Sequence, residues 1–226
     1  KSDGYRYYLK RDPIANDDVT EWMLSSLRLA SLGDMLKFHN KVMLDTPPYN
    51  TEYLDDILAD VEKKAQISLD GKVPYTLRDK VIDGKLYVDQ GIIAGCAGGG
   101  FENICAAADI IKGHNIGSDA FTFSVYPAST PIYMELVKNG VVADLMEAGT
   151  VVKTAFCGPC FGAGDTPANN AFSIRHTTRN FPNREGSKLQ SGQISSVALM
   201  DARSIAATAA NKGYLTPATA FDVEYK

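Results

Sequence analysis

The chain has few cysteines and no long hydrophobic run, and each of these features argues against one class of protein. It has four cysteines in 226 residues, which is too sparse for a secreted scaffold held together by disulfides. No apolar run approaches the ~20 residues of a membrane span, so no membrane partner is expected. A basic excess is also missing, since the formal net charge is −4, and a general affinity for nucleic acid is not expected. These features favour a cytoplasmic protein with reduced thiols.

The chain begins with polar residues and has no recognisable signal peptide or initiator methionine. We therefore expect a fragment of a larger protein, with a single α/β domain across residues 1–226. Residues 1–84 are mostly helix-forming, with helical patterns over 16–42 and from Thr51 to Ala65. Residues 85–226 are expected to form the core of the domain.

From Leu86 onward, short apolar runs alternate with helical patterns. The strands predicted by these runs are Leu86–Ala94, Phe121–Tyr126, Val151–Phe156 and Ala171–Ile174. The predicted helices are Phe101–Lys112, Thr130–Lys138, Val141–Glu147 and Ala198–Lys212. This rhythm is typical of an α/β layer structure with a mainly parallel sheet.

Three cysteines follow two of the predicted strands. Cys157 and Cys160 flank a Gly-Pro turn after one strand, and Cys96 opens a glycine-rich loop after another. Because the loops that follow parallel strands share one edge of the sheet, these sulfurs can converge there. Three thiolates suit an iron–sulfur cluster in which one iron keeps an open position and can act as a Lewis acid on a bound hydroxyl or carboxylate. The pattern therefore favours hydration and dehydration chemistry over electron transfer.

Two arginines lie in the Pro- and Asn-rich loop downstream of the cysteines. Arg179 and Arg184 are close enough in sequence to point into one pocket. A guanidinium binds a carboxylate through two parallel hydrogen bonds, which lysine cannot reproduce. The predicted substrate is therefore a polycarboxylate, held by a metal at one end and by arginines at the other.

Other interpretations of these residues remain open. Cys157 and Cys160 also have the spacing of a thioredoxin-type redox pair, but that motif opens a helix and the residues after Cys160 are poor helix formers. Structural zinc held by Cys96 and His176 is a second alternative. The glycines at 98–100, which precede a predicted helix, could instead cradle a phosphate. Cys105 is expected to be a buried helix residue.

Four spaced motifs resemble the aconitase family, which includes isopropylmalate isomerase. In order they are Ala94-Gly95-Cys96-Ala97-Gly98, Phe123-Ser124-Val125-Tyr126-Pro127-Ala128-Ser129, Cys157-Gly158-Pro159-Cys160-Phe161-Gly162, and Thr178-Arg179-Asn180-Phe181 with Arg184. The resemblance runs from about Leu86 to Thr216. It implies a three-layer α/β/α domain, corresponding to the family's third domain only. It also implies a [4Fe-4S] cluster on Cys96, Cys157 and Cys160, with Arg179 and Arg184 binding the substrate's carboxylates.

For the complete protein, the resemblance implies a hydro-lyase of the aconitate hydratase type that acts on a small hydroxy-carboxylic acid. The family's catalytic serine and its histidine–aspartate pairs belong to other domains, so no catalytic residue is assigned here. The chain alone is expected to be inactive and to need the remaining domains of the same polypeptide. Gly95, Ala97 and Gly98 replace the Ser and Thr-Asn of the family's first motif, and Thr178 replaces an Asn. These departures keep open a non-catalytic pseudoenzyme or binding module.

Overall fold

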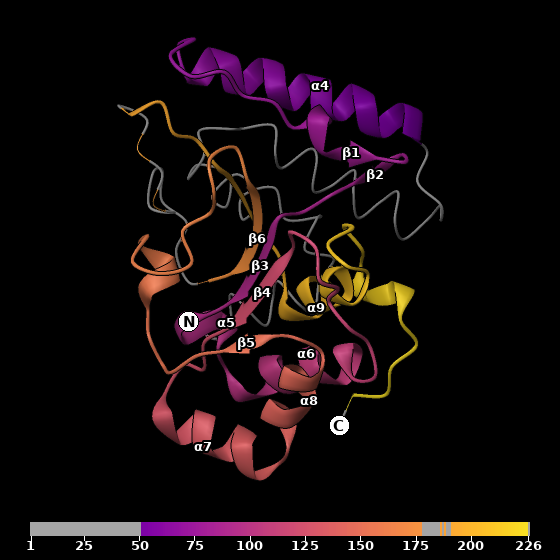
Figure 1. Ribbon diagram of the computed structural model, residues 1–226, viewed down its shortest axis with the longest axis vertical. Helices are drawn as coiled ribbons and strands as arrows, with labels where there is room; N and C mark the ends of the chain where they lie inside the picture. Colours follow the sequence, from indigo (N-terminus) through magenta and orange to yellow (C-terminus); the bar gives the residue numbers. More distant parts are fainter. Residues whose placement is uncertain (1–50, 178–185, 187, 189–190, 226) are drawn as a thin grey trace.

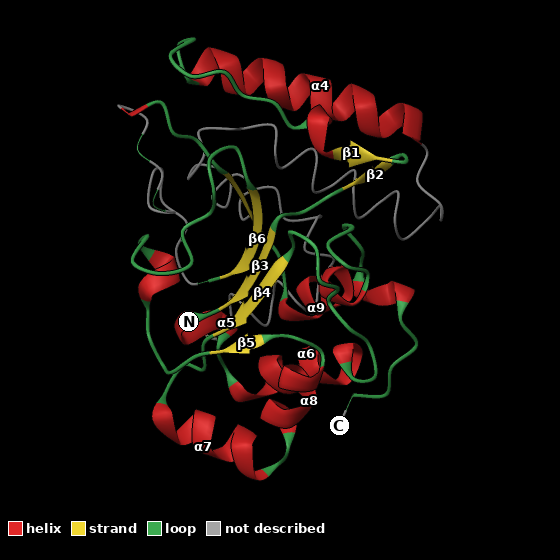
Figure 2. Cartoon of the chain, viewed as in Figure 1, coloured by secondary structure: helices red, strands yellow, loops and turns green. Residues whose placement is uncertain are grey.

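A five-stranded parallel sheet forms the centre of the molecule in the computed structural model, which describes residues 51–177, 186, 188 and 191–225. The strand order is β5-β4-β3-β6-β7, and every pairing between neighbours is parallel. The strands are β3 (Gln90–Ile93), β4 (Thr122–Val125), β5 (Val151–Val152), β6 (Phe172–His176) and β7 (Ser196–Leu199). With its flanking helices (Figures 1 and 2), this sheet confirms the predicted three-layer α/β/α class.

Helices cover one face of the sheet through a continuous apolar core. They are α6 (Phe101–Ile111), α7 (Thr130–Lys138), α8 (Val141–Glu147) and α9 (Ala202–Ala210). Helix α9 packs on β3 and β6, and α6 packs on α9 and α8. Phe123 and Ile174 are fully buried on this side, and Gly91 leaves room for the Ile205 side chain against the backbone of β3. We call it the apolar face.

The N-terminal part of the described chain packs at the end of the sheet opposite to α5 (Gly95–Gly98), as Figure 1 shows. It comprises α4 (Thr51–Ser68) and the antiparallel hairpin of β1 (Val81–Ile82) and β2 (Lys85–Leu86). Leu58 and Val61 of α4 are fully buried in the same core as the sheet. The helix predicted from Thr51 is therefore confirmed, whereas the helical pattern over 16–42 lies outside the described residues.

Several predicted bounds were confirmed. Helix α7 has the predicted bounds, with the Ser129 hydroxyl accepting a hydrogen bond from the Ile132 backbone N–H and a proline in the first turn. Helix α6 starts at Phe101 as predicted and ends at Ile111, one residue before the predicted Lys112. The single strand predicted over Leu86–Ala94 is divided into the end of β2 and the whole of β3.

Two other predictions were wrong. The strand predicted over Val151–Phe156 is only the two-residue edge strand β5, and Val151 is 51% exposed. The helix predicted from Ala198 starts at Ala202 instead, because Ala198 and Leu199 belong to β7. Asp201 then caps α9, its carboxylate accepting from the backbone N–H groups of Arg203 and Ser204. The predicted helix thus combined the end of the buried strand β7 with the alanine-rich helix α9 that follows it.

Within the part of the chain that the structure describes, no helix has the length and apolar character needed to cross a membrane.

Candidate functional site

The loops that carry the sequence motifs start at one edge of the sheet. Ile93 at the end of β3 is in register with Val125 of β4 and His176 of β6. Val125 is in turn in register with Val152 of β5. The loops after these four strands therefore leave the sheet at its carboxyl edge, where ligands bind in open α/β folds.

The Cys96 loop is a single helical turn, α5, fixed between the ends of two strands. The Ala94 N–H donates to the His176 carbonyl at 2.9 Å, and the Ala128 N–H donates to the Gly99 carbonyl at 2.8 Å. Gly95, the first residue of α5, has a φ of +75°, which favours glycine. Cys96 itself is exposed.

Gly98 explains one of the departures from the family's first motif. A Cβ atom at this position would overlap the carbonyl oxygen of His176, so α5 packs with its backbone directly against the end of β6. The larger polar side chain of related motifs does not fit in this arrangement.

Cys157 and Cys160 lie in a tight turn. Gly158–Cys160 form the 3₁₀ helix η4, and the N–H groups of Phe161 and Ala163 both donate to the Gly158 carbonyl at 3.0 Å. Cys157 is exposed and Cys160 is buried, with 7% exposure. No α-helix continues from η4 in the described residues that follow, as expected from the poor helix formers after Cys160 and unlike a thioredoxin-type motif.

The two cysteine loops lie next to each other, since α5 and η4 are in contact. All four cysteines are thiols rather than disulfides, and Cys105 is half-buried in α6. Among the described residues, no three or more His, Cys, Asp or Glu side chains are grouped so that they could hold a metal ion. The assignment of Cys96, Cys157 and Cys160 as ligands therefore stays a prediction.

The predicted substrate-binding arginines, Arg179 and Arg184, lie outside the described residues, as does Thr178. The strand that leads to them ends at His176, which is buried on the apolar face. Burial and the nearby charge of Arg203 lower the pKa of His176 to about 3, so the imidazole is neutral at pH 7. His176 is thus a neutral core residue at the carboxyl edge.

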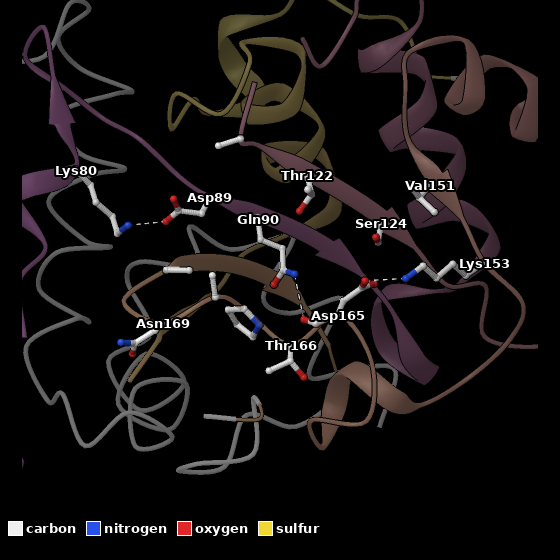
Figure 3. A pocket seen from close by; sticks show the side chains of 14 residues that line it. Lys80, Asp89, Gln90, Thr122, Ser124, Val151, Lys153, Asp165, Thr166 and Asn169 are labelled. Atoms are coloured by element: carbon white, nitrogen blue, oxygen red, sulfur yellow. Dashed lines mark hydrogen bonds and ion pairs between the residues drawn. The ribbon is translucent and has the colours of Figure 1, made fainter. Parts of the chain in front are cut away.

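The other face of the sheet is polar and carries a pocket of about 480 Å³. Figure 3 shows two ion pairs in it, Lys80–Asp89 and Lys153–Asp165, with N–O distances of 2.6 and 2.7 Å. Thr122 and Ser124 of β4 and Gln90 of β3 line the pocket between these pairs. No cysteine is among the residues that line it. We call this side the polar face.

Asp165 belongs to the loop that returns from the cysteine turn across the polar face. Burial opposes ionisation of its carboxyl group, but hydrogen bonds from Lys153, Tyr126 and Ser124 outweigh that effect and lower the pKa. Its φ of +48° is unusual for a residue other than glycine. The Asp165 backbone carbonyl accepts from the Gln90 side chain at 3.0 Å. Side chain and backbone together anchor the loop.

Sequence reasoning missed the buried residues beneath this loop, above all Arg175. Phe172 and Ile174 alternate in β6 with Ser173 and Arg175, and this period of two is a signal of a strand with one polar face. Such a pattern ordinarily indicates solvent exposure. Here both polar side chains are buried, because the loop from the cysteine turn covers them.

Comparison with known proteins shows the family of the chain. The family model described as the aconitase family (aconitate hydratase) matches residues 33–207, which is most of the chain and starts well before the first motif. The chain belongs to the aconitase family. The hydratase class therefore has support at the level of the family.

The curated proteins that this aconitase-family chain resembles are longer than the region that matches it. The 3-isopropylmalate dehydratase large subunit of Helicobacter hepaticus is 30% identical over 174 residues, 73% of this chain and 40% of that protein. The corresponding subunit of Clostridium kluyveri is 30% identical over 138 residues, 61% of this chain and 33% of that protein. A probable methanogen homoaconitase large subunit of Methanothermobacter thermautotrophicus is 29% identical over 153 residues, 67% of this chain and 35% of that protein. The matches thus span two fifths or less of these relatives.

Proposed function

We propose that this chain is the cluster-binding domain of a hydro-lyase that removes and re-adds water on a small hydroxy-carboxylic acid. Cys96, Cys157 and Cys160 would hold a [4Fe-4S] cluster, and Arg179 and Arg184 would bind substrate carboxylates. The observation that carries the proposal is the contact between α5 and η4, which puts two cysteine loops from different strands side by side at the carboxyl edge. The names of the relatives favour a substrate of the isopropylmalate or homoaconitate kind.

The donor set fits the proposed cluster in chemical type. Three thiols lie in two adjacent loops, and none of them is consumed in a disulfide. Each cysteine of such a cluster binds a different iron, so the sulfurs need not gather around one point as they do for a single ion. When bound, the cluster would supply a Lewis acid at the iron that lacks a cysteine ligand.

The chain's own residues would position that chemistry. Gly98 and Gly99 let α5 approach the ends of β6 and β4 closely, because a Cβ atom at either position would overlap a backbone atom there. Cys160 is buried, so its turn is held against the protein, whereas Cys96 and Cys157 are exposed. A substrate bound at that edge would meet the loop after β6, which carries Arg179 and Arg184, and their forked guanidinium groups would fix its carboxylates.

Anaerobic reconstitution with iron and sulfide tests the ligand assignment. The wild-type chain should take up about four irons and become brown, as a [4Fe-4S] protein does. Cys160→Ser should bind clearly less iron, whereas Cys105→Ser should match the wild type because Cys105 lies within α6 and is not one of the proposed ligands. Full iron content in Cys160→Ser would show that the ligand assignment is wrong.

Substrate binding is tested in the complete protein, where we expect Arg184→Lys to raise KM more than it lowers kcat. A lysine keeps the charge but loses the two-pronged contact. Unchanged kinetics would remove Arg184 from the site.

A non-catalytic aconitase-like module is the alternative, and the packing of Gly98 favours it because the polar side chain of related motifs has no space there. An activity assay on the complete protein distinguishes the two proposed functions. A module would lack hydratase activity on hydroxy-carboxylates even after full reconstitution of its iron content.

A further inference from the structure

Arg175 is the most deeply buried charged side chain of the described core, with 1% exposure. It projects from β6 onto the polar face and reaches the cysteine turn. Its Nη1 donates to the Pro159 carbonyl at 2.9 Å, and its Nε donates to the Ser173 hydroxyl at 2.9 Å. Pro159 stands between Cys157 and Cys160, so this bond ties the turn to the sheet.

Gln90 of β3 extends the same network to the far end of the loop. Its Oε1 accepts from the Ser173 hydroxyl at 2.8 Å and from Arg175 Nη2 at 3.3 Å. The Asp165 carbonyl accepts from Gln90 Nε2 at 3.0 Å and from Arg175 Nη2 at 3.3 Å. Two neighbouring strands thus hold the loop at Pro159 and at Asp165.

The strand from which this loop departs gives it little support. β5 is an edge strand of only two residues, paired with β4 alone. The loop leaves β5 and crosses the polar face to reach Arg175 of β6, on the far side of β3. The hydrogen bonds within the turn itself, such as that from Phe161 to Gly158, are local and do not fix its place on the sheet.

We propose that Arg175 is a positioning residue that locks the Cys157–Cys160 turn against β3 and β6 beside α5. Its consequence for a cluster rests on the function proposed above, but the locking of the turn does not. An arginine suits the task because its planar fork reaches several acceptors at once, whereas lysine offers one point and glutamine is shorter and uncharged. A buried cation beside the turn also favours the negative charge of a thiolate-ligated cluster.

Hydrogen–deuterium exchange on the full chain without iron tests the proposal directly. In Arg175→Gln, the amides of Cys160, Phe161 and Ala163 should exchange roughly tenfold to hundredfold faster, as expected for losing hydrogen bonds from a charged group. Arg175→Lys should give an intermediate rate. Amides in the middle of β3 and β6 should stay slow in both variants.

Arg78→Gln is the matched control. Arg78 also binds through its guanidinium, to Glu62 of α4 at 2.8 Å, at the end of the sheet away from the cysteine loops. The Arg78→Gln variant should leave the exchange rates of the turn amides unchanged. Wild-type rates at the turn in both Arg175 variants would overturn the proposal, and so would equal acceleration across the turn and the sheet, because that result would mark Arg175 as a general core residue.

The rate at which a chelator removes iron from the reconstituted chain extends the test to the cluster. Arg175→Gln should lose iron faster than both Arg175→Lys and Arg78→Gln. Failure of the wild type to take up iron would refute the proposed function, while the exchange rates would still decide the role of Arg175. A loosened turn with an unchanged rate of iron loss would overturn the link between positioning and cluster.

Discussion

The two faces of the central sheet are built from the same strands but have different roles. On the apolar face, Phe123 and Ile174 are fully buried in the core that α6 and α9 complete. On the polar face, the alternate positions carry Gln90 and Arg175, which hydrogen-bond to the loop of the cysteine turn, and Ser173, which hydrogen-bonds to both of them. The period of two in a strand therefore separates residues that hold the fold from residues that hold the candidate site.

The two faces also treat charge in different ways. His176 of the apolar face has a lowered pKa mainly because burial penalises its charged form. Asp165 of the polar face has a lowered pKa despite burial, because Lys153, Tyr126 and Ser124 bond to its charged form. The apolar face disfavours the charged form of His176, whereas the polar face stabilises the charged form of Asp165. Both arrangements make the fold sensitive to acid, over different ranges of pH.

Truncating the apolar face should have the largest effect on stability. Phe123→Ala removes a fully buried ring from β4 and should lower the free energy of unfolding by about 3–5 kcal/mol. Urea denaturation followed by circular dichroism measures this change. Met134→Ala in α7 is the control, because this side chain is half-exposed and its loss should cost less than about 0.5 kcal/mol. Similar losses in the two variants would contradict the assignment of Phe123 to the core.

The apolar face was also the more predictable of the two. The predicted helix over Thr130–Lys138 was confirmed because a cap, a proline and the following turn all act locally. β5 and β7 were misjudged because sheet position depends on distant partners: Val151 pairs only at an edge, and Ala198 sits in a strand despite its helical propensity.

The candidate site was predictable only in part. The strand ends and the convergence of the Cys96 and Cys157 loops followed from the rule for parallel sheets. The role of Arg175 did not, because its partners in the loop are the backbone carbonyls of Pro159 and Asp165, which no residue type encodes. Contacts of this kind depend on the path of a loop over the sheet, which local sequence does not specify.

The second-largest effect should be a loss of stability in acid caused by the buried neutral His176. Its pKa is about 3 in the folded state and near 6.5 when unfolded, so the unfolded chain binds the proton more tightly. The stabilisation is complete above pH 6.5 and is lost as pH falls towards 3. Between pH 6.5 and pH 4.5 the free energy of unfolding should fall by roughly 2 kcal/mol, measured by urea denaturation at each pH.

His176→Gln should flatten the pH dependence over this range. Asp165, whose pKa is lowered from 3.8, should act only below about pH 4, so Asp165→Asn should leave the upper range unchanged. A wild-type slope in His176→Gln would mean that another group causes the loss.

The smallest effect should come from the polar face, at the ion pair that closes one end of the pocket. Lys153 Nζ lies 2.7 Å from Asp165 Oδ1, and the two side chains are 36% and 15% exposed. Lys153→Gln should raise the pKa of Asp165 and lower the free energy of unfolding by about 1 kcal/mol, because a partly buried carboxylate loses its cation but keeps its other hydrogen bonds. Lys138→Gln, which breaks the more exposed pair with Glu135 in α7, should change stability by less than about 0.5 kcal/mol. Equal small effects in the two variants would mean that solvent already screens Asp165, and that hydrogen bonds to its backbone carbonyl, not its charge, hold this loop on the polar face.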